Sequence, residues 1–366
     1  MKRRNFLKRA AAAGAAVAAL SQPAAPALAQ GKRELRMVTA WPKGFPGLGT
    51  GAERLARAIT EATEGALAVK VFAAGELVPA AQVFDAVIDG TADLYHAPDY
   101  YFRDKSKAYN FFTTIPFGMT AGEMDAWIYY GGGQQLWDEV SAPFGIKPLL
   151  AGNSGAQAFG WFRREIKAIE DFKGIRFRIS GLGGEVLRAF GVNAVALPPN
   201  EIFAAFQAGA LDAAEWVGPW NDLALGLHKL ARYYYFPGVM EPSAALTCGF
   251  NKRTWDDLPT GHKRAIANAA AADNSLMQAE FSARNNDALG TLRADHGVQL
   301  RRLSDDIVRQ LGAAARDVVA AIGGADAATR KVYESYLAFR KKALAWSNVA
   351  DQALLAARAL PFKFGG

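Results

Sequence analysis

Short apolar runs typical of buried strands alternate along the chain with amphipathic runs typical of helices. Strand and helix in turn are typical of α/β architecture with largely parallel sheets. The alternation is present before residue 90 and resumes after residue 147. The predicted elements in chain order are strand 35–41, helix 51–63, strand 67–72, helix 80–89, strand 147–151, strand 175–179, helix 184–190, strand 194–197 and helix 200–208.

After Pro259 the pattern changes to long alanine-rich helical stretches. These are predicted over 263–292, 304–323 and 328–346, with a last short helix reaching Leu360. A tail of helices behind two α/β units suits a hinged clamp with a helical brace. The sequence therefore favours a two-lobed protein.

A faint internal repeat supports two similarly wired lobes. In both copies an apolar helix meets a glycine suited to a helix C-terminal cap, and an aspartate follows at the same spacing. The matched positions are Phe84, Gly90 and Asp93 in the first copy and Phe203, Gly209 and Asp212 in the second. Chance is the alternative, because helix, glycine, strand is a common succession.

The first residues are typical of a cleavable export signal. The segment Met1 to Arg9 is basic, an apolar stretch follows to Leu20, and the segment ends at Ala29 with small residues. We expect a signal peptide over 1–29. The pair Arg3-Arg4 resembles a twin-arginine signal, and an ordinary secretory signal with two arginines is the alternative. Both place the mature protein in the periplasm.

Charge and composition exclude several classes of function. The chain has 366 residues, of which 51% are hydrophobic and 21% charged, which is enough for two globular domains. The formal charge of +7 falls to +2 when the signal is removed, because 1–29 holds five basic residues and no acid. Nucleic-acid binding is therefore not indicated.

Cysteine and histidine usage argues against a disulfide and against a zinc site. Cys248 is the single cysteine and lies in the apolar run 244–250, where a buried strand thiol is expected. The histidines do not have ligand spacing. They are His96, His228, His262 and His296.

Two enzyme motifs are incomplete. Residues 152–156 begin like a serine nucleophile elbow, but Ala156 replaces the closing glycine. The glycine clusters at 47–51 and 181–184 do not complete a dinucleotide-binding fingerprint. Flexible turns between strand and helix explain these clusters better.

Two charged groups remain as candidates for binding chemistry. Arg176 and Arg178 share one face of a predicted strand, and an arginine at the end of such a strand suits a carboxylate ligand. A surface salt bridge is the alternative for either residue. Glu215 lies among apolar residues, so it needs a proton or a cation beside it, and a metal ion with oxygen ligands would satisfy it.

Several segments around these residues are similar to the receptors of TRAP transporters of the DctP type. The match runs from about residue 34 to 345 and is closest to the alpha-keto acid-binding branch. The segments that carry it are Gly152 to Ile166, Asp212 to Trp220, Tyr233 to Gly238, Ala74 to Leu77 with Gly90 and Asp93, and Asn251-Lys252 with Trp255 and Pro259.

The resemblance implies a binding site for a small carboxylate and a cation. Arg178 would fix the substrate carboxylate. Oxygen atoms of Gln157, Glu215 and Trp216, the last through its main chain, would hold sodium or calcium; such hard oxygen donors suit these ions and not zinc or copper. Asn153, Tyr100 and Tyr101 match positions near the ligand, although packing at the lobe interface explains each tyrosine equally well.

One departure from the related receptors concerns the segment after the Pro237-Gly238 turn. Aromatic residues are usual there, whereas this chain has Val239 and Met240 before Glu241. Substrate identity is therefore open between a 2-oxo acid and a 2-hydroxy acid, such as pyruvate or lactate. Glu241 becomes an additional candidate ligand for the cation.

These inferences combine into one expected architecture, a periplasmic-binding-protein-like clamp with a long helix spanning both lobes. The resemblance places chain crossings near residues 153 and 242. Lobe I is expected over 31–153 plus about 243–275, lobe II over 154–242 plus about 276–325, and a helical segment over 326–366 that exchanges between subunits of a dimer.

The expected function is that of a TRAP-transporter solute receptor. It would need no organic cofactor, and its protein partners would be the membrane subunits. The rival from another class is a secreted α/β enzyme with Glu215 as general base.

Overall fold

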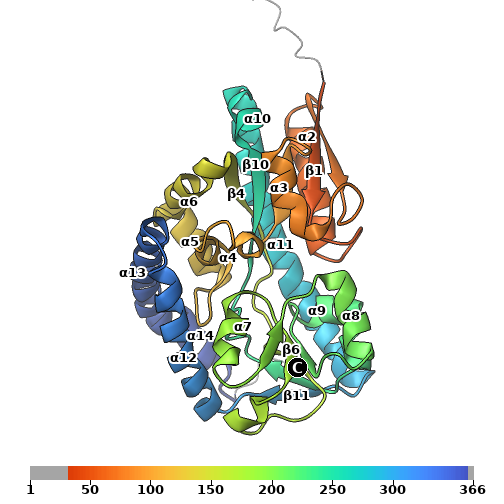
Figure 1. Cartoon of the computed structure of the whole chain (residues 1–366), viewed down its shortest axis with the longest axis vertical. Helices are drawn as coiled ribbons and strands as arrows, with labels where there is room; N and C mark the ends of the chain where they lie inside the picture. The colour runs from red at the N-terminus through yellow and green to blue at the C-terminus, as the bar shows by residue number, and fades with distance from the viewer. Residues whose placement is uncertain (1–31, 362–366) are drawn as a thin grey trace, which may run out of the picture.

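The computed structural model describes residues 32–361 and has two lobes, each built around a mixed β-sheet (Figure 1). The predicted signal peptide lies outside the described residues. The first sheet has the order β2-β1-β3-β10-β4, with β1 (Arg33–Thr39), β2 (Leu67–Phe72), β3 (Leu94–Ala97), β4 (Ile146–Asn153) and β10 (Ala245–Asn251). The second has the order β11-β9-β5-β8-β6-β7, with β5 (Gly160–Phe162), β6 (Arg176–Arg178), β7 (Asn193–Val195), β8 (Ala213–Ala214), β9 (Tyr233–Phe236) and β11 (Gln299–Arg302).

Helices cover both sheets, and the C-terminal helices line one side of the molecule (Figure 1). The α-helices are α2 (Leu48–Ala62), α3 (Val83–Ile88), α4 (Tyr109–Thr113), α5 (Ala121–Tyr130), α6 (Gly133–Ser141), α7 (Gly181–Arg188), α8 (Pro199–Gln207), α9 (Pro219–Leu225), α10 (Lys252–Asp256), α11 (Thr260–Ala294), α12 (Asp305–Gly323), α13 (Ala327–Val349) and α14 (Asp351–Arg358). Short 3-10 turns are η1 (Ala80–Gln82), η2 (Asp99–Phe102), η3 (Ala142–Phe144), η4 (Ile169–Phe172) and η5 (Leu227–Lys229).

Helix α11 joins the two lobes, as expected. Its 35 residues begin directly after Pro259, and proline is well tolerated at the entry to a helix because no intrahelical N–H is lost there. The helix packs on β4 and α2 in one lobe and on α9 in the other, and Figure 1 shows it running from the upper to the lower half. Its alanine-rich sequence permits this length because alanine is the strongest helix former.

The two lobes share their wiring. In the first sheet β1 pairs in parallel with β2 and β3, and in the second β6 pairs in parallel with β7 and β8. The prediction of largely parallel sheets is therefore only partly right. Strands β10 and β5 each enter antiparallel, because they receive the chain after it crosses from the other lobe.

The internal repeat corresponds to real structure. Gly90 and Gly209 both have a left-handed backbone, with φ of 84° and 74°, directly after α3 and α8. The carboxylate of Asp93 accepts hydrogen bonds from the backbone N–H and Nε of Arg36, and Asp212 accepts the same pair from Arg176. The same helix–glycine–aspartate unit thus fastens β1 in the first lobe and β6 in the second.

Buried apolar side chains fill each lobe, and the C-terminal helices brace one side. One cluster surrounds the first sheet and α11 and continues into the second lobe at Trp161, Ala214 and Tyr234, and a second lies between the second sheet, α7 and α12. Helix α13 packs on α4, α5 and α6, whereas α14 is exposed along its length. Within residues 32–361, none of the helices combines the length and apolar character that crossing a bilayer requires.

Candidate functional site

Arg178 is buried at the end of β6 and is held on three sides. Its Nε donates to the Leu197 carbonyl at 3.1 Å, and its Nη2 donates to Ser180 Oγ at 2.9 Å. Its Nη1 donates to the main-chain and side-chain oxygens of Glu215, at 2.5 and 3.2 Å. Glu215 reaches it because Arg178 pairs with Ala214 across β6 and β8. The guanidinium is therefore fixed before any ligand binds.

Arg176 has a different environment, although it lies two residues earlier on the same strand. Its Nε and Nη2 donate to the Asp212 carboxylate at 2.9 and 2.7 Å. The side chains of this pair are 47% and 33% exposed, whereas those of Arg178 and Glu215 are 1% and 2% exposed. The surface salt bridge is thus the correct interpretation of Arg176 and the wrong one for Arg178.

A second buried carboxylate, Glu241, faces the same site. The Tyr100 hydroxyl donates to its Oε2 at 3.4 Å. Burial raises the pKa of Glu241 to about 7, with Arg178 opposing the shift. Burial, and then the nearby Glu241, also raise the pKa of Glu215, and Arg178 again opposes. Two carboxylates therefore face a single guanidinium in a place from which water is excluded.

Gln157 is oriented by Ser154. Its Nε2 donates to Ser154 Oγ at 2.8 Å, and that same oxygen accepts from the backbone N–H of Ala244 at 2.9 Å. The serine of the incomplete nucleophile elbow therefore positions a neighbouring amide. Asn153 lies beside it, with its Oδ1 accepting from the backbone N–H of Gly155 at 2.9 Å.

The buried oxygen atoms of the site fit a hard cation. Within residues 32–361, one carboxylate oxygen of Glu215, one of Glu241 and the side-chain oxygen of Gln157 are buried without a hydrogen-bond partner. Leaving such atoms unpaired is costly, and a bound cation would satisfy all three. Carboxylate and amide oxygens are hard donors, which suit sodium or calcium better than zinc. Among the described residues there is no cluster of three or more His, Cys, Asp or Glu that could hold a metal.

Trp216 closes one wall of this site. The Arg178 guanidinium lies over its ring, 5.0 Å from the centroid, and Phe45 from the other lobe meets the ring edge-on at 6.1 Å. Its indole Nε1 is buried and has no partner among the described residues. Stacking on an aromatic face further restricts the guanidinium.

Tyr100 and Tyr101 separate an inner cavity from an outer cleft. Both line the inner cavity of ≈ 20 Å³ and the outer cleft of ≈ 660 Å³. Burial raises the pKa of Tyr101 to about 12, with Arg178 opposing, so both phenols stay protonated at neutral pH. Across the cleft, Arg103 of the first lobe donates to the Gly181 carbonyl at 3.1 Å and to Glu185 at 3.0 Å in the second.

The fold therefore brings the residues predicted for substrate and cation into one interlobe region. Sequence reasoning missed Ser180, Ser154 and the Leu197 carbonyl, which hold the predicted residues in place. The only signal for Ser180 was its position directly after the strand that carries Arg178. A main-chain carbonyl such as that of Leu197 leaves no signal in the side-chain sequence.

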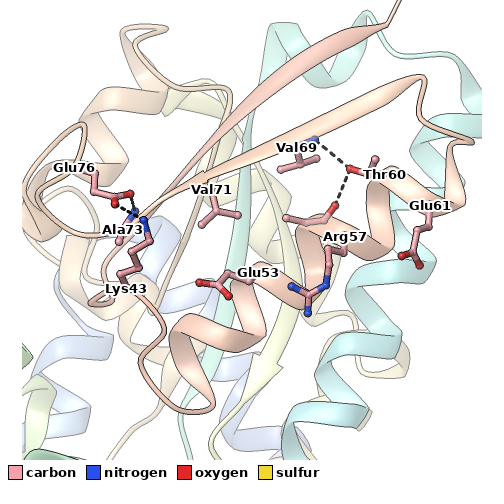
Figure 2. A pocket seen from close by; sticks show the side chains of 10 residues that line it. Lys43, Glu53, Arg57, Thr60, Glu61, Val69, Val71, Ala73 and Glu76 are labelled. Atoms are coloured by element: carbon pink, nitrogen blue, oxygen red, sulfur yellow. Dashed lines mark hydrogen bonds and ion pairs between the residues drawn. The ribbon is translucent and has the colours of Figure 1, made fainter.

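Figure 2 shows a separate hollow on the first lobe, between α2 and β2. It measures ≈ 440 Å³, and its rim carries the Lys43–Glu76 ion pair of 3.1 Å, whose side chains are 79% and 39% exposed. Thr60 Oγ1 accepts from the Val69 backbone N–H at 3.2 Å at its floor. None of its lining residues belongs to the predicted site, and its charged groups are solvated.

Comparison with known proteins places this site in context. A relative from Nostoc sp., described as a monocarboxylate 2-oxoacid-binding periplasmic protein, is 41% identical over 96% of this chain and 97% of its own. A TRAP transporter solute-binding protein of Bordetella bronchiseptica, a mixed-occupancy dimer with calcium and picolinate bound, superposes with a TM-score of 0.87 at 34% identity, covering 90% of this chain and 97% of its own. One from Pseudoalteromonas atlantica, with sodium and pyruvate bound, gives 0.86 at 34% identity, covering 89% and 99%.

The family model for bacterial extracellular solute-binding proteins, family 7, matches residues 37–324. The prediction of a receptor is thereby confirmed. The rival prediction of an enzyme with Glu215 as general base finds no support in the family. The chain belongs to the family 7 extracellular solute-binding proteins and is a binding protein of the periplasm, not an enzyme.

Proposed function

We propose that this receptor binds a small 2-oxo monocarboxylate together with a sodium or calcium ion and delivers it to the membrane subunits of a TRAP transporter. The observation that carries the proposal is the set of three unpartnered buried oxygens, from Gln157, Glu215 and Glu241, beside the fixed guanidinium of Arg178. An anion site and a cation site are adjacent, which suits a ligand that offers a carboxylate and a second oxygen.

The geometry suggests how the ligand is shared. Four of the five N–H groups of Arg178 already donate within the protein, so one Nη2 N–H remains for a carboxylate oxygen of the ligand. A second, parallel bond would form if Glu215 turned its carboxylate from Arg178 to the cation. The oxygens of Gln157, Glu215, Glu241 and the Trp216 main chain would hold the cation, which would supply positive charge for the other carboxylate oxygen and the 2-oxo oxygen of the ligand. A 2-hydroxy acid such as lactate offers the same edge with a hydroxyl in place of the 2-oxo oxygen.

Charge balance favours calcium over sodium. With both glutamates ionised, the two carboxylates and one arginine carry a net charge of minus one, and a monocarboxylate adds another negative charge. A divalent cation neutralises the set, whereas a monovalent cation leaves one negative charge in a buried place, which is costly. The relatives described above hold calcium with picolinate and sodium with pyruvate, so both ions suit this type of site.

We further propose that the lobes close by a hinge at the chain crossings near residues 153 and 242. Lobe I would comprise 31–153 plus about 243–275, and lobe II 154–242 plus about 276–325. The direct hydrogen bonds of Arg103 to Gly181 and Glu185 support a closed arrangement. Closure would bury the ligand and present a changed surface to the membrane subunits.

Calorimetric titration of the mature protein tests the ligand proposal. After removal of metal with a chelator, pyruvate is titrated with sodium, with calcium and with neither. We expect tight binding only with a cation, and loss of binding in Arg178→Ala while the matched variant Arg176→Ala still binds. Cation-independent binding, or binding that survives in Arg178→Ala, would contradict the site.

We also propose that the C-terminal segment, residues 326–366, makes a homodimer. Supporting this are large apolar side chains exposed on α13 and α14, namely Trp346, Val349, Leu354, Leu355 and Leu360, at 60–73% exposure. Contiguous exposed apolar surface of this kind marks interaction sites. The Bordetella bronchiseptica relative is described as a dimer.

Light scattering coupled to gel filtration tests the dimer. Wild type is expected at twice the monomer mass, and the double variant Leu354→Ser with Leu355→Ser at the monomer mass. Tyr130→Ser is the control, because Tyr130 is 93% exposed on α5, outside this segment. A monomeric wild type, or a dimeric double variant, would exclude this interface.

A further inference from the structure

Apolar side chains make up about half of the lining of the inner cavity. The polar groups of this cavity of ≈ 20 Å³ come from Gln157, Ser154, Tyr100, Tyr101 and Glu241. Its apolar wall is formed by Trp41, Leu48, Pro98, Val217, Ala244 and Leu246. A space of this size holds about one water-sized sphere. Trp216, over whose ring Arg178 lies, also lines the cavity, so a ligand held by its carboxylate at Arg178 and reaching into the cavity would meet this apolar wall.

Trp41 is the largest side chain of this wall, and it is locked in place. Its indole Nε1 donates to His96 Nδ1 at 2.8 Å, and His96 Nε2 lies 3.1 Å from the Ala151 carbonyl. Because indole is only a donor, His96 Nδ1 must be the acceptor, and its proton must reside on Nε2 and be donated to Ala151. Trp41 and His96 are 2% and 0% exposed.

The hydrogen bonds that hold Trp41 and His96 persist at neutral and mildly acidic pH. Burial lowers the pKa of His96 to about 4, so the imidazole stays neutral and keeps its acceptor nitrogen. Rotation of Trp41 would break its buried hydrogen bond to His96 and leave both the indole N–H and the imidazole acceptor unpaired, which is costly. Trp41 therefore cannot retreat to admit a longer ligand as a flexible methionine or leucine side chain would.

We propose that Trp41 is the specificity-determining residue that limits the chain length of the ligand, and that His96 is the positioning residue that holds it. The proposal rests on the proposed function, because it takes the carboxylate as fixed at Arg178. The substrate class it names is the shortest 2-oxo acids. An added methylene that has no space changes affinity by about 10- to 200-fold in a rigid apolar pocket.

The test compares pyruvate, 2-oxobutanoate and 2-oxo-4-methylpentanoate by calorimetry in saturating calcium. In wild type we expect affinity to fall along this series. In Trp41→Phe, the ratio between 2-oxo-4-methylpentanoate and pyruvate should shift by at least about tenfold toward the longer acid. His96→Leu should shift the ratio in the same direction, and His96→Asn, which can still accept from the indole, should restore it.

The matched control is Trp137→Phe. Trp137 is equally buried in the same lobe, and its indole donates to Asp99 at 2.7 Å, but it does not line the cavity. This variant should lose stability and leave the ratio unchanged. If Trp41→Phe fails to fold, Leu246→Ala opens the same wall and should shift the ratio in the same direction.

An unchanged ratio in a folded Trp41→Phe or Leu246→Ala protein, or an equal shift in Trp137→Phe, overturns the role of Trp41 while leaving the proposed function intact. Binding of the three acids by wild type with equal affinity also overturns it. Absence of binding for every acid refutes the proposed function and this inference with it.

Discussion

Strands β6 and β8 carry two arginine–carboxylate pairs that differ in almost every physical respect. Arg176 and Asp212 form an exposed bidentate pair whose hydrogen-bonding groups satisfy one another. Arg178 and Glu215 are buried, and one Glu215 oxygen has no partner within the described chain. The exposed pair is complete as it stands. The buried pair leaves one carboxylate oxygen uncompensated, and a bound cation would compensate it.

The other lobe sharpens this contrast. Arg36 and Asp93 reproduce the Arg176–Asp212 arrangement on β1 and β3, so the exposed pair belongs to the shared wiring of the lobes. Two residues further along β1, Val38 occupies the position that Arg178 has on β6, because Val38 pairs with Tyr95 as Arg178 pairs with Ala214. A pair that recurs in both lobes fastens strands. The pair that occurs once is the one that we propose for ligand binding.

The largest expected effect separates the two arginines. Arg178→Ala and the milder Arg178→Lys should weaken pyruvate binding by at least about 100-fold and about tenfold, because the first removes the charge and the second only the planar fork. Arg176→Ala should change the dissociation constant by less than about twofold. Isothermal calorimetry measures the dissociation constant of all three variants. Equal losses of affinity at the two arginines would show that they do not differ in function.

An intermediate effect concerns which cation is used. Glu241→Gln removes one negative charge from the cation site, so a monovalent ion should then suffice to balance it. We expect the preference for calcium over sodium to fall by at least about tenfold, because ligand charge sets calcium affinity. Competition titrations monitored by pyruvate affinity measure this. Asp212→Asn is the control and should leave the preference unchanged.

A smaller effect concerns stability. Asp212→Asn and Asp93→Asn should each lower the Tm of the ligand-free protein by only about 2 °C or less, since exposed ion pairs contribute little and are screened by salt. The change at Asp212 should be the larger, because Asp212 is held by Nε and Nη2 of Arg176 at 2.9 and 2.7 Å, whereas the Arg36 side chain meets Asp93 through Nε alone at 3.5 Å. Differential scanning calorimetry at low and high salt measures both. A large loss of Tm at either position would show that the ion pair contributes more to stability than its solvent exposure indicates.

The smallest effect is on how the free energy of unfolding changes with pH in acid. The hydrogen bonds from Arg176 hold the pKa of Asp212 below its usual value. The unfolded chain therefore takes up a proton more readily, and the stabilisation present above the usual pKa is lost as pH falls through the folded value. Chemical denaturation between pH 5 and 3, compared with Asp212→Asn, should show a shallower decline in the variant. Parallel curves for wild type and variant would show that Asp212 does not contribute to the acid dependence of stability.

Much of the fold was predictable because its signals are local. The long helix near α11 and the strand carrying Arg178 follow from periodicity, and the glycine–aspartate repeat led to two equivalent lobes. The antiparallel entry of β5 and β10 was not predictable, since it depends on where the chain crosses between lobes. Glu215 was indicated by its apolar surroundings, whereas Gln157 and the Trp216 main-chain oxygen came from resemblance to a family. The different environments of Arg178 and Arg176 could not be predicted, because two arginines on one strand face have the same pattern in sequence.

The shared wiring of the two lobes has a consequence for how such receptors diversify. At the ends of equivalent strands, one lobe presents Glu215, which touches the arginine that would hold the ligand's head, and the other presents His96, which holds the wall that would meet its tail. In our proposals, head-group recognition rests mainly on residues of one lobe and length discrimination mainly on residues of the other. Substitutions in either lobe should then retune one property with little effect on the other, so that new specificities are reachable in single steps.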